Sequence, residues 1–225
     1  MNDYFDCNIW LDADNYKSAN GIYSTALSYT KSPEAANEFL LRQYEKSPER
    51  YYAYTAAPVM RWFDVDLLVR SHAACIRLFP KRLNFSLAGS ETEPLLKELE
   101  SRRLPVMVWH TETTWSEISA VCERYPMLPV IIDGNDKKLL YHNRVFIPLM
   151  LKNLNLYLET FNLIQYLFYE TLVNKYSIDR FVFGTNYPQN SPLAPLNMLL
   201  SADIPEEARE KILNGNIKTL ISNII

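Results

Sequence analysis

The chain has 225 residues, of which 48% are hydrophobic, so it is long enough to bury a substantial core. Its formal net charge is only −3, the sequence pI is about 5.7, and no run of lysine or arginine exceeds two residues. Nucleic acid and an anionic membrane surface are therefore excluded as expected partners. The sequence predicts one domain over residues 1–225 with no export signal and no membrane span, and we expect a cytoplasmic protein.

Eight short apolar runs alternate with helical stretches along the chain. This alternation is typical of parallel strands that are joined by crossover helices. Several runs are continuous valine, isoleucine, leucine or phenylalanine, as a sheet covered on both faces requires. We predict strands over Tyr4–Trp10, Ile22–Tyr29, Tyr52–Ala57, Ala74–Leu78, Val106–His110, Val130–Asp133, Leu156–Glu159 and Phe181–Gly184.

The stretches between these runs carry helix signals. Ser32-Pro33-Glu34 supplies an N-cap, a first-turn proline and an acid ahead of an apolar face. Residues 113–125 and the stretch from Pro205 to about Ile221 place apolar side chains at spacings of three and four. Eight strands and about as many helices predict a compact (β/α)8 TIM barrel of class α/β.

Cysteines and histidines are few in this chain. They are Cys7, Cys75, Cys122, His72, His110 and His142. The cysteines lie far apart inside apolar segments, which indicates buried thiols and no disulfide. The histidines form neither an H-x-H nor an H-E-x-x-H motif, so the common histidine-rich metal sites have no basis in the sequence.

Several short segments match a known pattern in their order and spacing. They are IRLFP at 76–80, LPVMV at 104–108, NLYLET at 155–160, DRFVFGTNYP at 179–188 and KILNGN at 211–216. On these segments the chain from Ala74 to Ile221 resembles the amidohydrolase-related family, metal-dependent hydrolases and decarboxylases with a TIM-barrel fold. DCN at 6–8, with LFP at 78–80 and FSL at 85–87, is similar to a functionally obscure branch of that family.

The resemblance also shows where this chain departs from the metal-binding members. Those members carry H-x-H at the end of strand one, a histidine after strand five, another after strand six and an aspartate after strand eight. The five columns hold Asn8, Trp10, Trp109, Gly134 and Asn186 in this chain. Neutral asparagine and tryptophan do not bind zinc usefully. We therefore predict that the barrel binds no catalytic transition metal, and we expect no other cofactor.

His110 follows the ligand column of strand five by one residue. Because strand side chains alternate, this shift turns the imidazole away from the barrel mouth unless the strand has ended or bulges there. At the mouth, His110 with Glu112 or Asp133 would form a general acid/base pair. The alternative is a histidine whose hydrogen bonds are satisfied at a strand end.

Arg77 is a permanent charge inside an apolar strand, and it has two interpretations. A planar guanidinium is suited to hold a carboxylate or phosphate of a ligand. Because buried charges are usually paired, the other interpretation is a structural ion pair with an acid such as Glu112 or Glu159.

Further polar and aromatic residues are expected at the strand ends, where barrel enzymes bind ligands. Trp10 and Trp109 are large enough to plug the space of a metal and its water, or to stack on a ligand. Asn186 keeps the hydrogen bonds of the lost aspartate or binds substrate. Asn8 and Tyr187 complete this set of candidate ligand-binding residues.

Two functions are consistent with these residues, and whether the protein is an enzyme stays open. The first is a metal-independent hydrolase or related lyase that acts on a small anionic molecule, with Arg77 as anchor and His110, Glu112 and Asp133 as acid/base candidates. The second is a non-catalytic protein that binds a small molecule or a partner. A cavity at the strand ends far below the ~300 Å³ of typical ligand sites would count against the enzyme. Family relatives often dimerise, so the resemblance also adds a homodimer to the assemblies considered for this chain.

Overall fold

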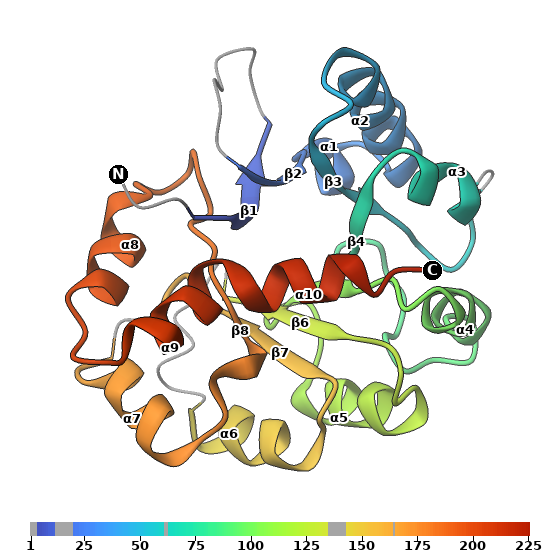
Figure 1. Ribbon diagram of the computed structural model, residues 1–225. Coiled ribbons are helices and arrows are strands. Elements are labelled where there is room, and N and C mark those ends of the chain that lie inside the picture. The colour runs from blue at the N-terminus through green and yellow to red at the C-terminus, as the bar shows by residue number, and fades with distance from the viewer. Residues whose placement is uncertain (1–3, 12–19, 61–62, 135–142, 164) are drawn as a thin grey trace.

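Eight parallel strands follow one another around a barrel in the computed structural model (Figure 1). The structure describes all residues except 1–3, 12–19, 61–62, 135–142 and 164. Each strand pairs with its predecessor in the sequence. The strands are β1 (Asp6–Trp10), β2 (Gly21–Ser24), β3 (Tyr51–Thr55), β4 (Ala73–Leu78), β5 (Val106–Trp109), β6 (Val130–Asp133), β7 (Leu156–Glu159) and β8 (Phe181–Val182).

The ring closes between β8 and β1 through the chain that follows β8. The Cys7 N–H donates to the Phe183 carbonyl at 2.9 Å, and the Trp10 N–H donates to the Tyr187 carbonyl at 2.7 Å. Ile9 also forms an isolated parallel bridge with Tyr187. The barrel is thus nearly closed, which confirms the predicted (β/α)8 fold.

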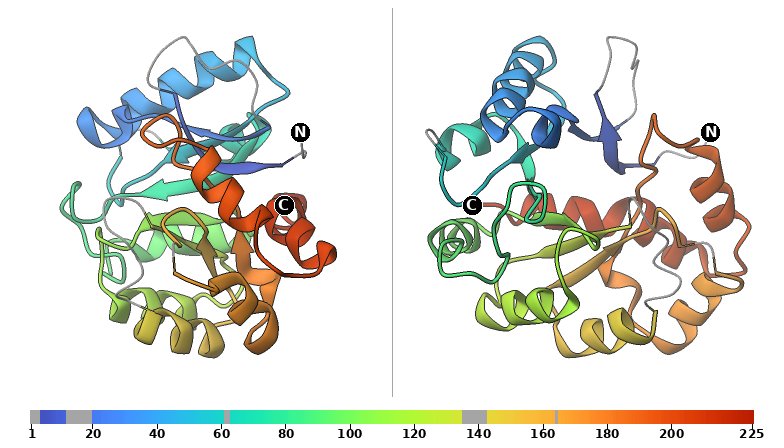
Figure 2. Two further views of the ribbon diagram at one scale, coloured as in Figure 1. Left: turned by 90° about the vertical axis from the view of Figure 1, so that its left-hand side faces the viewer. Right: turned by 180° about the vertical axis from the view of Figure 1, so that it is seen from behind.

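Helices form an outer layer around the strands (Figure 2). They are α1 (Leu27–Thr30), α2 (Pro33–Lys46), α3 (Val65–Arg70), α4 (Glu93–Ser101), α5 (Trp115–Arg124), α6 (Asn143–Lys152), α7 (Phe168–Lys175), α8 (Leu193–Leu200), α9 (Glu206–Glu210) and α10 (Asn216–Ser222). The predicted cap of α2 is confirmed, because the Ser32 hydroxyl accepts from the Ala35 N–H at 3.2 Å. Within the described ranges, no helix is both long and apolar enough to traverse a bilayer.

The last helical segment closes the end of the barrel at which the strands begin, and α10 crosses in front of them in Figure 1. Ile217 and Leu220 of α10 pack with Phe5 and the first apolar residues of several strands. A π-helical turn at Lys211–Gly215 separates α9 from α10. Carbonyl groups of this turn accept main-chain hydrogen bonds from Phe5 and Phe183, both at 3.1 Å. The segment is therefore bonded to both strands of the seam.

Several predicted boundaries are wrong. The first strand begins two residues later than predicted, at Asp6, and the third ends two residues earlier, at Thr55. The second strand ends at Ser24, not Tyr29, because the Thr25 carbonyl accepts from the Ser28 hydroxyl at 2.7 Å and turns the chain into α1. The last strand ends two residues earlier than predicted, at Val182. The helix predicted from Pro205 to Ile221 is interrupted by the π-helical turn. At the end of β2 a local hydrogen bond thus overrides the apolar pattern.

Candidate functional site

Arg77 lies at the centre of a buried polar network inside the barrel. It points inward from β4 and is 1% exposed. Its Nε donates to the Ser24 hydroxyl at 2.6 Å, its Nη1 to Asp133 Oδ2 at 2.9 Å and its Nη2 to Asn8 Oδ1 at 2.8 Å. The guanidinium also lies over the Trp10 ring, 4.5 Å from its centroid. Arg77 therefore forms a structural ion pair with Asp133 instead of the expected Glu112 or Glu159.

Asn8 connects the members of this network. Its side-chain oxygen accepts from Arg77 and from the Trp10 indole N–H at 3.0 Å, and its Nδ2 donates to Asp133 Oδ2 at 3.2 Å. Both ends of the amide are thus used within the protein. The structure thus brings together four of the predicted site residues, and these residues bind one another. They are Asn8, Trp10, Arg77 and Asp133.

Two further carboxyl groups are buried in the same region. Asp6 Oδ2 accepts from the Thr185 hydroxyl at 2.5 Å, and Oδ1 accepts from the Asn8 and Thr185 N–H groups at 3.0 and 3.1 Å. Burial raises the pKa of Asp6 to about 7, although these hydrogen bonds and the charge of Arg77 act in the opposite direction. Sequence reasoning missed this residue, although an acid inside an apolar strand is the same signal that identified Arg77.

Glu159 ends β7 and is fully buried. Its Oε1 accepts from the Phe161 N–H at 2.6 Å. Burial, together with the nearby charge of Asp133, raises the pKa of the Glu159 carboxyl well above its usual range. The lack of a side chain at Gly184 makes room for it, since a Cβ there would lie 2.3 Å from Oε1.

An aromatic cluster covers the network on the side where the strands end. Trp10, Phe79 and Trp109 are at most 3% exposed, and Tyr29 packs against them. The two indole rings meet edge to face at 5.8 Å, and Phe79 meets Trp109 at 5.3 Å. Trp10 and Trp109 are therefore buried in packing contacts with each other and with Phe79.

Glu112 links the loop that follows β5 to the loop that follows β4. Its carboxylate binds the guanidinium of Arg82, and its Oε2 also accepts from the Arg82 N–H at 2.9 Å. The same guanidinium lies 4.6 Å from the centroid of a Trp109 ring and 5.2 Å from that of Tyr29. Arg82 was not predicted, because this pairing crosses between the loops after β4 and β5.

His110 does not extend the fifth strand, which ends at Trp109. Its ring stacks on Trp115, the first residue of α5, with the planes 27° apart. Its Nδ1 lies 3.4 Å from the main-chain oxygen of Asp133, whose carboxylate binds Arg77. The structure therefore brings His110 to the main chain of Asp133 and to the helix layer, which does not support the predicted acid/base pair.

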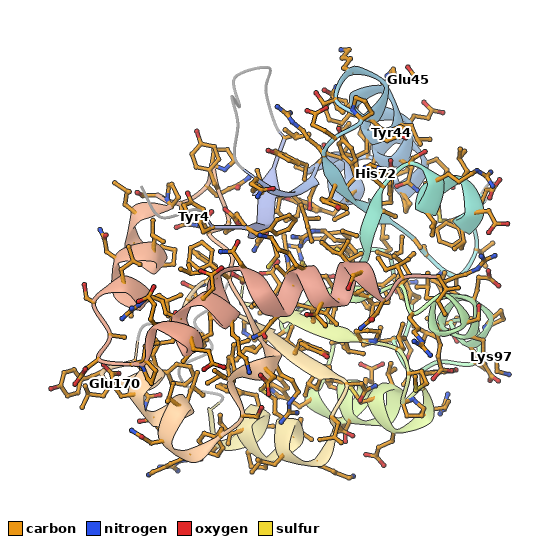
Figure 3. All side chains as sticks on the ribbon, viewed as in Figure 1. Tyr4, Tyr44, Glu45, His72, Lys97 and Glu170 are labelled. Carbon is orange, nitrogen blue, oxygen red and sulfur yellow. The ribbon has the colours of Figure 1, made fainter. Side chains whose placement is uncertain are left out.

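The remaining predicted residues have other positions. Asn186 has φ 55°, a left-handed conformation that asparagine tolerates, and Tyr187 bonds to β1 at the barrel seam. His72 packs on Tyr44 and Tyr51 beside α2, away from the mouth (Figure 3). His142 lies outside the described residues.

The cysteines do not supply a nucleophile. All three are buried and free. Burial raises the pKa of Cys75 and of Cys122 to about 12, and it raises the pKa of Cys7 well above its usual range. These thiols stay protonated at neutral pH, and a thiol is a weak nucleophile.

A small hollow remains beside the filled centre, between the loops that follow β7 and β8. We call it the β7/β8 hollow. Its volume is about 170 Å³. It is lined by Thr160, Phe161, Asn162, Leu163, Asn190, Ser191, Ala194, Pro195 and Met198. Hydroxyl and amide groups thus face apolar side chains, and no lining residue is charged. A larger, more open hollow of about 470 Å³ lies between α5 and α6 in the outer layer.

The residues present do not fit the metal of the resembling enzymes. In two of the expected ligand columns, Asn8 binds Arg77 and Asp133, and Trp10 packs on the guanidinium. A positive guanidinium at the centre repels a second cation. Among the residues that the structure describes, no group of three or more histidine, cysteine or acidic side chains is placed to hold a metal ion.

No family model and no curated protein sequence matches this chain. Several solved structures are similar to it in fold. A 2,6-dihydroxybenzoate decarboxylase from Rhizobium is 14% identical, with 99% of each chain covered and a TM-score of 0.71. A putative 2-pyrone-4,6-dicarboxylic acid hydrolase from Pseudomonas putida is 13% identical, with full coverage of both chains and a TM-score of 0.69.

An amidohydrolase II structure is 12% identical, covers 97% of this chain and 99% of its own, and has a TM-score of 0.68. At such identities the likeness concerns the fold alone. The fold is that of an amidohydrolase-type TIM barrel, which confirms the resemblance at this level.

Proposed function

We propose that this protein is a non-catalytic member of the amidohydrolase-type barrels, which works by binding a small molecule. The observation that carries the proposal is that the described polar and aromatic side chains at the barrel mouth contact one another. Arg77 and Asp133 bind each other, Glu112 binds Arg82, and Trp10 and Trp109 cover them. The Nε, Nη1 and Nη2 atoms of Arg77 each donate to a protein oxygen, so this guanidinium is engaged within the protein and is a poor anchor for an anionic substrate.

The β7/β8 hollow is the proposed binding site. It lies at the strand ends, where barrel proteins bind ligands, and its volume is below the ~300 Å³ of typical ligand sites. Its lining offers amides and hydroxyls from Asn162, Asn190 and Ser191 beside Phe161 and Met198. This combination favours a small neutral molecule with a polar and an apolar side.

The binding site is tested by a screen of small neutral amides, alcohols and lactams, with the thermal unfolding midpoint as the readout. Fragments that raise the midpoint of the wild type should lose this effect in Ala194→Trp, whose indole would fill the β7/β8 hollow. The matched control is Ser119→Trp in the α5/α6 hollow, which should leave the effect intact. Loss of the effect only in Ser119→Trp would place the binding site elsewhere.

The absence of catalysis is tested with the compounds named for the two neighbouring enzymes. We expect no turnover of 2,6-dihydroxybenzoate or 2-pyrone-4,6-dicarboxylate, with or without added manganese. Turnover that disappears in Arg77→Lys would overturn the proposal and restore the barrel mouth as an active site.

A second candidate function is a metal-independent hydrolase or lyase, and one observation favours it. Glu159 is a buried carboxyl with a raised pKa, and the next residue, Thr160, lines the β7/β8 hollow. A carboxylic acid that stays protonated near neutral pH is suited to act as a general acid. If a fragment found in the screen is consumed, Glu159→Gln should abolish its consumption and leave its binding unchanged.

A further inference from the structure

Three strands present oxygen atoms to one buried cation. Ser24 of β2 offers a hydroxyl, Asn8 of β1 an amide oxygen and Asp133 of β6 a carboxylate oxygen. All three lie between 2.6 and 2.9 Å from nitrogen atoms of Arg77. The guanidinium is planar and cannot lose its proton in a protein, so this charge is permanent.

The residues that replace the expected metal ligands of β1 both contact this guanidinium. Asn8 accepts its hydrogen bond at 2.8 Å, and the ring of Trp10 lies under it at 4.5 Å. The indole N–H of Trp10 in turn donates to Asn8. The two substitutions that remove a metal site therefore build a site for a flat organic cation.

The buried ionisable groups of the barrel interior also support a fixed cation at this position. Asp6, Asp133 and Glu159 are at most 1% exposed, and Arg77 is the single lysine or arginine that is buried in the described part of the chain. Buried charges are costly unless they are paired. The fixed positive charge of Arg77 thus compensates the carboxylate of Asp133, with which it forms an ion pair.

We infer that the guanidinium of Arg77 takes the place of a bound metal ion as the fixed cation of this barrel. The cation site is retained, but the protein fills it with its own side chain. Removal of that side chain opens a cavity that accepts a free guanidinium ion. This inference concerns the centre of the barrel and does not depend on the β7/β8 hollow.

The inference is tested by rescue of Arg77→Ala with guanidinium chloride at low millimolar concentration, with sodium chloride at equal ionic strength as reference. We expect the variant to unfold roughly 10 °C below the wild type, since it leaves a buried carboxylate unpaired. Guanidinium should recover about half of this loss and should not raise the midpoint of the wild type. A midpoint in Arg77→Ala that guanidinium leaves unchanged or lowers would overturn the inference.

Leu78→Ala is the matched control. It removes a fully buried neighbour on β4 and leaves an apolar cavity with no unpaired charge. We expect a comparable loss of stability without any guanidinium effect. Equal rescue of both variants would show a non-specific effect of the salt and would overturn the inference.

A second pair of variants applies where Arg77→Ala does not fold. Arg77→Met should be less stable than the double variant Arg77→Met/Asp133→Leu, because the double variant leaves no unpaired carboxylate at this position. A double variant that is less stable than the single one would contradict the inference. Near-stoichiometric zinc or manganese in wild-type protein, measured by plasma mass spectrometry after incubation and desalting, would also overturn it.

Discussion

The centre of the barrel and its β7/β8 side bury polar groups in different ways. At the centre, Arg77 and Asp133 compensate each other's charge, and Trp10 of the aromatic cluster packs on the guanidinium. On the β7/β8 side, Asp6 and Glu159 are held by hydroxyl and main-chain N–H groups, and burial raises the pKa of both carboxyls. The centre thus contains a compensated ion pair, whereas the stability of the β7/β8 side depends on the protonation of Asp6 and Glu159.

The largest expected effect is at the centre. Trp109→Ala should lower the free energy of unfolding by about 4 kcal/mol, since it removes a fully buried aromatic side chain from a packed cluster. Urea denaturation measures the change. The control Trp115→Ala removes a partly buried indole and should cost less. A loss near zero in Trp109→Ala would show that the mouth is open.

The second effect is a pH dependence on the β8 side. The folded-state pKa of Asp6 is about 7, above its ordinary value of 3.8, so ionisation destabilises the fold as the pH rises between these values. Asp6→Asn preserves the shape and removes the charge. It should gain on the order of 3 kcal/mol relative to the wild type at about pH 8, and almost nothing at about pH 4. A pH-independent difference between the two proteins would contradict this assignment.

The third effect concerns the space that Gly184 leaves for the Glu159 side chain. In Gly184→Ala the new Cβ would lie 2.3 Å from Oε1 and 2.8 Å from the carboxyl carbon, so we expect a loss of about 2 kcal/mol. Gly215→Ala is the control, because the nearest atom to its Cβ would be 3.8 Å away. Equal stabilities of the two variants would show that Glu159 is free to move.

The smallest effect is expected for the ion pair of Glu112 and Arg82, on the loops that follow β5 and β4. Arg82 is partly exposed, so Glu112→Gln should cost about 1 kcal/mol or less. Glu93→Gln removes an exposed partner of Lys97 and should cause no measurable change. A much larger loss in Glu112→Gln would mean that this ion pair belongs to the charge-compensated centre.

Most elements of the fold could be predicted from local sequence features. Apolar runs identified all eight strands, and Ser32 marked the start of α2, because both signals depend on a few neighbouring residues. The end of β2 was mistaken because apolar residues continue past Ser24, while a hydroxyl hydrogen bond at Thr25 decides the turn.

The pairing of the buried polar residues could not be predicted from the sequence. The expectation that a buried arginine is paired held for Arg77, yet its partner Asp133 comes from β6, two strands away in the ring. That choice depends on the stagger of β4 against β6, which no local spacing records. The same reason explains why Arg82 was overlooked as the partner of Glu112.

The π-helical turn has a consequence for how the chain is made. Its carbonyl groups bond to the main chain on both sides of the seam, next to Phe5 and Phe183. During synthesis on a ribosome, β1 emerges long before residues 183–187, which bond to it at the seam, and residues 211–215 emerge later still. Closure of the ring therefore comes after the synthesis of all eight strands, and the edge of β1 is the surface that a nascent chain must keep from pairing with other chains.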